Sequence, residues 1–231
     1  MLRVLGPLIL ASLLLFACTP ATEGERVSVE EFTGPLSYYP RETGAAWEYL
    51  PDNARLDETP IVQRVEGPTV IDGDVWISWH MTGRGLDVSW FRQYRSAGVF
   101  LKREQRPGTI ITFDPPIQEF PTENSLRVGL TWNGVTTAKL FFPDATADNQ
   151  RREIQTEYRY TVVDRRSVTL AAGTFEVFVI NFITRTVGDQ GETTDEFRQE
   201  LWFSPFVGEV RTENDFFLVG ANFLEKPEGQ N

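Results

Sequence analysis

Tight-turn dipeptides between short apolar runs constrain the fold of this chain more than any other feature. Asp72-Gly73 lies between the apolar residues 70–71 and 75–77, and both of its residues tolerate the positive φ angles of a two-residue hairpin. A second turn is predicted on the same grounds at Asn133-Gly134, and a third at Ser96-Ala97-Gly98, which separates the strand-like runs 88–94 and 99–103. Turn signals at this spacing are typical of antiparallel β structure, in which each strand folds back on the one before it.

The rest of the chain also favours strands. Apolar residues alternate through 154–162, and 175–187 is a long apolar run. Further strands are predicted at 192–203, 207–212 and 216–223.

No segment carries an amphipathic helical stripe with caps. The best helix candidate, 148–157, fits a strand period better. We therefore predict an all-β fold: an antiparallel meander of about ten to thirteen strands, forming a curled sheet, a barrel or half-barrel, or a sandwich. Residues 105–127 carry four prolines and are expected to form a long loop or an edge element.

The amino terminus has the parts of a secretory signal peptide. Arg3 precedes a 13-residue apolar run, Val4–Phe16, and the small residue Ala17 precedes the only cysteine, Cys18. The run is shorter than the roughly 20 residues that a membrane-spanning helix needs. We expect residues 1–17 to be the signal peptide; cleavage at another site and an uncleaved anchor remain alternatives.

The sequence Leu15-Phe16-Ala17-Cys18 resembles the lipobox of bacterial lipoproteins, with Phe16 where a small residue is usual. The resemblance implies cleavage before Cys18 and a lipid on its sulfur. That lipid would tether the protein to a membrane of the cell envelope, outside the cytoplasm, at the periplasmic face or the cell surface. Two or more acyl chains give stable anchoring.

The composition divides the remaining chain into three parts. Residues 18–35 comprise the lipidated cysteine and a polar stretch that we expect to be a flexible tether. Residues 36–224 are expected to form one antiparallel β domain, and residues 225–231 a polar tail.

Three short motifs occur in order along that domain: Tyr38-Tyr39-Pro40 with Gly44 and Trp47, then Gly173-Thr174-Phe175, then Trp202-Phe203-Ser204-Pro205-Phe206-Val207-Gly208. This set resembles a broad group of poorly characterised bacterial secreted lipoproteins with an antiparallel β domain. The resemblance implies that fold and location, and it brings no enzymatic activity and no functional residues with it.

Catalytic chemistry finds little support in the sequence. His80 is the only histidine, which excludes a metal site built on two or more histidines of this chain. Lipidation of Cys18 leaves no thiol nucleophile, and no Gly-x-Ser-x-Gly motif is present. The 33 acidic residues nominate no specific pair for glycoside hydrolysis. We therefore expect no enzyme activity, no catalytic residue, no metal site and no cofactor.

Binding is better supported than catalysis. Five aromatic residues on two neighbouring predicted strands could form a ligand surface, although core packing is the alternative; they are Trp76, Trp79, Trp90, Phe91 and Tyr94. A basic strip is predicted beside them, with cross-strand ion pairs as the alternative; it comprises Arg92, Arg95, Lys102 and Arg103. The net charge of −11 opposes binding to nucleic acid.

We therefore expect a lipid-anchored, non-catalytic module that binds a protein, glycan or lipid partner in the cell envelope. A carrier or chaperone of lipid or another apolar ligand, held in a concave half-barrel face, is the alternative. A glycan-directed hydrolase is the third hypothesis. A carrier requires an apolar pocket of a few hundred cubic ångströms, and an interaction module requires an exposed aromatic patch.

Overall fold

The computed structural model describes residues 30–188 and 192–224. These residues form twelve strands and one short 3₁₀ helix, η1 (Ala147–Asn149). The strands are β1 (Ala46–Pro51), β2 (Ile61–Ile71), β3 (Asp74–Gly83), β4 (Leu86–Arg95), β5 (Gly98–Arg106), β6 (Thr109–Phe120), β7 (Thr131–Phe141), β8 (Arg151–Leu170), β9 (Gly173–Val187), β10 (Thr193–Ser204), β11 (Gly208–Arg211) and β12 (Phe216–Ala221).

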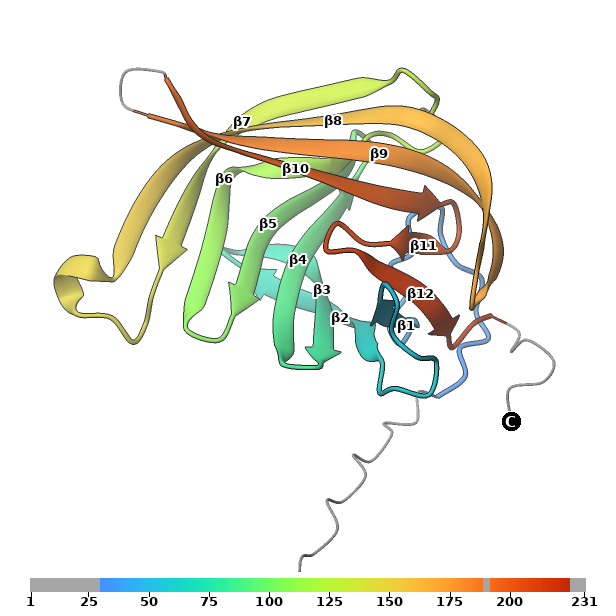
Figure 1. Ribbon diagram of the computed structural model, residues 1–231. Helices are drawn as coiled ribbons and strands as arrows, with labels where there is room; N and C mark the ends of the chain where they lie inside the picture. Colours follow the sequence, from blue (N-terminus) through green and yellow to red (C-terminus); the bar gives the residue numbers. More distant parts are fainter. Residues whose placement is uncertain (1–29, 189–191, 225–231) are drawn as a thin grey trace, which may run out of the picture.

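The strands form a closed barrel in meander order (Figure 1). Each strand pairs antiparallel with its neighbours in sequence, and β1 closes the barrel by pairing with β12, with Trp47 opposite Ala221. The predicted all-β antiparallel meander is confirmed, and closure selects the barrel among the predicted arrangements. In Figure 1 the long strands β7–β10 arch over the shorter strands.

Two of the three predicted hairpin turns are confirmed. Asp72-Gly73 joins β2 to β3 with φ angles of 54° and 89°, so both positions use the left-handed conformation that the dipeptide favours. Residues 96–97 join β4 to β5, and Gly98 begins the new strand.

The third predicted turn is wrong. Asn133-Gly134 lies inside β7, where Gly134 pairs with Tyr158 of β8. A Cβ atom on Gly134 would come within 2.4 Å of the Tyr158 Oη atom, so this glycine is needed for close packing and not for a turn. A dipeptide that favours a turn therefore continues as a strand here, because a partner ring occupies the space above it.

The proline-rich segment was also predicted wrongly. Most of it forms β6, which is paired on both sides in the barrel. The pairing with β5 breaks between Thr112 and Ile117, and the pairing with β7 ends at Asp114. The two prolines at 115–116 therefore lie where no ladder hydrogen bond is required of them.

The remaining strand predictions are confirmed. The segment 175–187 lies in β9, 192–203 corresponds to β10, and the last two strands form the expected hairpin. The helix candidate 148–157 is mostly strand, since β8 begins at Arg151.

The predicted signal peptide, Cys18, the first part of the tether and the tail lie outside the described residues. The described part of the tether contacts the barrel. The amide of Phe32 donates to the Asn222 carbonyl at 2.9 Å, and the Asn222 side chain donates to the Glu30 carbonyl at 2.6 Å.

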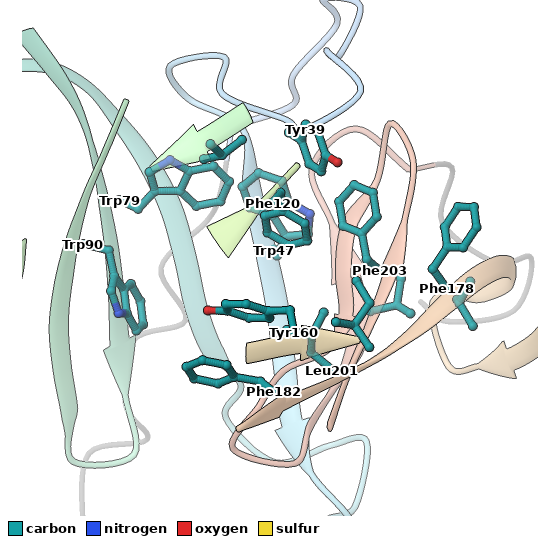
Figure 2. Packing of buried hydrophobic residues seen from close by; sticks show 14 of the residues in the cluster. Tyr39, Trp47, Trp79, Trp90, Phe120, Tyr160, Phe178, Phe182, Leu201 and Phe203 are labelled. Atoms are coloured by element: carbon teal, nitrogen blue, oxygen red, sulfur yellow. The ribbon is translucent and has the colours of Figure 1, made fainter. Parts of the chain in front are cut away.

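One end of the barrel is filled by aromatic rings, and we call it the filled end. Figure 2 shows Tyr39, Trp47, Phe120 and Phe203 gathered there, with Trp79 beside Trp47. The rings of Tyr39, Phe120 and Phe203 lie within 5.0 Å of one another between centroids, and Trp47 stacks on Trp79 at 5.1 Å. Tyr39 precedes β1, so a segment outside the barrel closes this end.

Candidate ligand-binding cavity

The other end of the barrel encloses a cavity of about 310 Å³. We call this the hollow end, and its wall comes from inward-facing residues that include Ile111, Leu140, Ile154, Thr156 and Thr184. The side chains of these five residues are aliphatic or short, so they leave the interior open at this end. Aromatic rings fill the interior at the opposite end. The volume lies at the low end of the range for small-molecule sites.

The cavity is reached from the hollow end. Phe182 on β9 is buried, whereas Thr184 and Thr186, further along the same face of the strand, are half-exposed. Phe113, Leu140 and the other wall residues towards the 107–108 and 142–150 turns are also half-exposed. This increase in exposure indicates that the mouth of the cavity lies at the start of β6 and β8 and at the end of β7 and β9.

Arg92 of β4 points into the barrel and pairs with Glu119 of β6. The Arg92 Nε atom donates to Glu119 Oε2 at 2.6 Å, and Nη2 donates to Oε1 at 3.1 Å. The guanidinium also lies over the rings of Trp79 and Trp90, at 5.1 and 5.5 Å from their centroids. The neighbouring carboxylate raises the pKa of Arg92 despite its burial, so this pair is ionised and mutually satisfied.

A β-bulge turns Glu209 of β11 into the cavity. Glu209 pairs with Phe203 and Arg211 with Trp202, so Val210 is an extra residue that breaks the alternation. Arg211 therefore lies on the outer face, where it pairs with Glu200 and Asp215. Glu209 lines the cavity on the opposite face and does not pair with Arg211. Burial raises the pKa of Glu209 to about 7. The positive charge of Arg92 acts to lower this pKa, and the negative charge of Glu119 acts to raise it.

Glu213 enters the same cavity from the turn between β11 and β12. Burial raises its pKa to about 8, and the nearby carboxylates of Glu209, Glu119 and Glu104 act in the same direction. Neither the Glu209 nor the Glu213 carboxylate accepts a hydrogen bond from, or forms an ion pair with, any residue in the described ranges.

A smaller recess of about 30 Å³ adjoins the cavity towards the filled end. The two spaces share Gln63, Arg92, Phe120 and Glu209 in their walls. Tyr39 also lines the recess; its hydroxyl is fully buried and finds no hydrogen-bond partner within the described part of the chain. A buried hydroxyl without a partner costs free energy unless a bound molecule or water satisfies it.

The structure separates the five predicted aromatic residues. Trp90 lines the cavity, and Trp79 and Tyr94 line the recess. Trp76 is buried but lines neither space, and Phe91 is half-buried and also lines neither. Trp76, Trp79 and Trp90 are each at most 9% exposed, so they do not form an outer aromatic patch.

The predicted basic strip is likewise divided. Arg92 lies inside the barrel, as described above. Lys102 lies 4.0 Å from Asp72, Arg95 donates to Gln93 and covers Phe100, and Arg103 donates to Thr112. Each of these three side chains therefore has a partner, on its own strand, on a neighbouring strand or, for Lys102, in the β2–β3 turn.

His80 lies between two carboxylates, with Nδ1 3.1 Å from Glu66 and Nε2 2.9 Å from Asp87. Over residues 30–188 and 192–224, no group of three or more His, Cys, Asp and Glu side chains is arranged to hold a metal ion. Over the same ranges, no helix has the length and apolar character to cross a membrane.

Comparisons with known proteins add little to this description. No family model and no curated protein matches the chain. One solved structure, described as a "putative lipoprotein" from Parabacteroides distasonis ATCC 8503, aligns with 82% of this chain and 100% of its own. Its sequence identity is 13% and its TM-score is 0.39, a similarity too low to support any conclusion about this chain.

Proposed function

We propose that this protein is a lipid-anchored, extracytoplasmic and non-catalytic carrier that holds a small apolar or amphiphilic molecule inside its barrel. The cavity of about 310 Å³ at the hollow end is the observation that supports this function. A concave space whose wall is mostly apolar and also carries polar groups is typical of small-molecule binding sites.

The position of the aromatic residues favours the carrier over a surface interaction module. A docking patch requires aromatic side chains on the outside. Trp90, Trp79 and Tyr94 instead line the interior spaces, where they would contact a ligand and not a protein surface.

The anchor is proposed on the lipobox sequence, since Cys18 lies outside the described residues. Metabolic labelling with an alkyne fatty acid should mark the wild-type chain, and the Cys18→Ala variant should be neither labelled nor cleaved. A Cys18→Ala chain that is still labelled and cleaved would contradict the anchor.

Photoaffinity labelling tests the carrier function directly. The full chain, reconstituted in nanodiscs, is illuminated with a neutral alkyl alcohol that bears a diazirine, and labelled peptides are mapped by mass spectrometry. We expect labels on inward-facing residues of β6–β9, such as Leu140 and Ile154.

A matched pair of variants on β7 controls for non-specific labelling. Ala138 is buried and lines the cavity, so Ala138→Phe should fill part of the space and abolish labelling of these peptides. Val135 on the same strand is 48% exposed, so Val135→Phe should leave labelling unchanged. Labelling that is confined to outer positions, or equal in both variants, would overturn the carrier function.

A further inference from the structure

The charges that face the cavity do not balance. Among its described lining residues there is one cation, Arg92, against four carboxylates, Glu104, Glu119, Glu209 and Glu213. Buried charges are normally paired, because an isolated charge loses its hydration without compensation. Protonation of Glu209 and Glu213 removes part of this excess, and a bound cation would balance it while both carboxylates stay ionised.

Two of the four carboxylates have partners. Glu119 accepts two hydrogen bonds from Arg92. Glu104 accepts the indole N–H of Trp90 at 3.2 Å and pairs with Arg106. These interactions leave Glu209 and Glu213 as the two acidic side chains of the cavity wall that no described residue satisfies.

A further unsatisfied group lies in the recess that adjoins the cavity. The buried hydroxyl of Tyr39 has no partner in the described ranges, and Tyr39 and Glu209 line the same recess. The cavity therefore combines a largely apolar wall with two carboxylates, Glu209 and Glu213, that form no hydrogen bond or ion pair with the described residues. The arrangement suits a ligand with an apolar body and a hydrogen-bond-donating head.

We propose that the cavity selects apolar ligands that carry a protonated amine, with the ammonium group held by Glu209 and Glu213. This inference rests on the carrier function proposed above and specifies the chemical class of its ligand. An ammonium group supplies up to three donors and one positive charge. It would offset the unpaired negative charge of these two carboxylates.

The same geometry discriminates against anionic amphiphiles such as fatty acids. Arg92 is the only cation of the described wall, and Glu119 engages it through two hydrogen bonds while two indole rings cover it. An anionic head would have to displace Glu119 and approach Glu209. Like charges in such a site repel each other, which lowers the affinity for an anionic head.

Binding of an amine should depend on pH. Several groups face Glu209 and Glu213 from the surrounding strands: Tyr49 of β1, Arg92 of β4, Glu104 of β5, Glu119 of β6 and Tyr160 of β8. Burial raises the pKa values of Glu209 and Glu213 to about 7 and 8. An ammonium beside them favours the ionised carboxylates, so amine affinity should rise as pH increases from 6 to 9.

Three photoaffinity probes with the same diazirine alkyl chain, ending in an amine, an alcohol or a carboxylate, test the inference. On the full chain in nanodiscs at pH 8, we expect the amine to label cavity peptides at about tenfold lower concentration than the alcohol. The carboxylate should label them least. The advantage of the amine over the alcohol should shrink at pH 6.

A double variant and a matched control locate the effect. The double variant Glu209→Gln/Glu213→Gln keeps the shape of both side chains but removes their negative charge. It should lose the preference for the amine, while the alcohol still labels the cavity. Glu157→Gln, on the outer face of β8, should leave all three probes unchanged.

The outcomes separate this inference from the carrier function. If no probe labels the cavity, the carrier function itself is wrong. If the alcohol labels the cavity but the amine has no advantage, or the double variant keeps that advantage, the amine selectivity is wrong and the carrier function stands.

Discussion

The two ends of the barrel are built from the same strands but are filled differently. β6 contributes Phe120 to the filled end and Ile111 to the hollow end. β9 changes in the same way, from buried Val177 to half-exposed Thr184. A segment that precedes β1 adds Tyr39 at the filled end, and the long strands at the other end receive no such cover from the described chain.

This comparison shows how one barrel can combine stability with an open interior. Aromatic rings at the filled end bury large apolar areas, and this burial is the main favourable contribution to folding. The smaller side chains of the hollow end leave room for a ligand and contribute less to stability. We therefore expect substitutions at the filled end to affect folding, and substitutions at the hollow end to affect binding.

Truncation of a large side chain at each end should give the largest contrast. Trp47 is 1% exposed, so Trp47→Ala should lower the free energy of unfolding by about 3–5 kcal/mol. Ile154 borders open space, and Ile154→Ala should cost about 1 kcal/mol because no new enclosed cavity forms. Urea unfolding followed by circular dichroism measures both values. Equal losses would contradict a difference in packing between the ends.

Two glycines at opposite ends of β5 test whether the backbone is also packed more tightly at the filled end than at the hollow end. A Cβ atom on Gly98 at the filled end would lie 2.1 Å from the Phe120 carbonyl oxygen, and its φ is 132°. Gly108 at the hollow end has a φ of 71°, and its nearest neighbour would be Asp144 at 3.6 Å.

We expect Gly98→Ala to cost about 3 kcal/mol, from backbone displacement and strain, and Gly108→Ala about 1 kcal/mol. Thermal unfolding of both variants measures the difference. A Gly98→Ala protein as stable as the wild type would show that the filled end can yield to accommodate a methyl group.

The carboxylates of the hollow end should produce an effect on stability that depends on pH. The folded-state pKa values of Glu209 and Glu213 are raised from 4.5 to about 7 and 8. The native state therefore holds protons that the unfolded chain releases, and stability should fall as pH rises from about 4.5 to 8.

The double glutamine variant removes this contribution and should exceed the wild type by several kcal/mol at pH 9, with a smaller difference at pH 4.5. Denaturant unfolding at the two pH values measures it. A difference between variant and wild type that stays constant with pH would contradict the burial of these carboxylates.

Local sequence signals predicted most of the strands but not every turn. Asp72-Gly73 and Asn133-Gly134 are equivalent as dipeptides, yet only the first forms a hairpin. The second lies in β7 because the ring of Tyr158 packs against Gly134. The prolines of β6 also led to a wrong prediction, of a loop or an edge element. Only the pairing of β6 with β5 and β7 shows that positions 115–116 need no ladder hydrogen bond.

The candidate site was predicted in part. Trp90 and Arg92 were singled out from the sequence, and both line the cavity. Glu209 and Glu213 were not, because strict alternation places Glu209 and Arg211 on one face, where they would neutralise each other. The bulge at Val210 separates them, and no signal in the sequence marks that bulge.

The sequence by itself determined the antiparallel meander, because alternation and turn chemistry act over a few residues. Only the tertiary structure decided that the meander closes, through β1 and β12, which pair Trp47 with Ala221. It also decided which end is filled and which side chains meet in the cavity. Those outcomes depend on contacts between residues far apart in the chain, which local propensity does not encode.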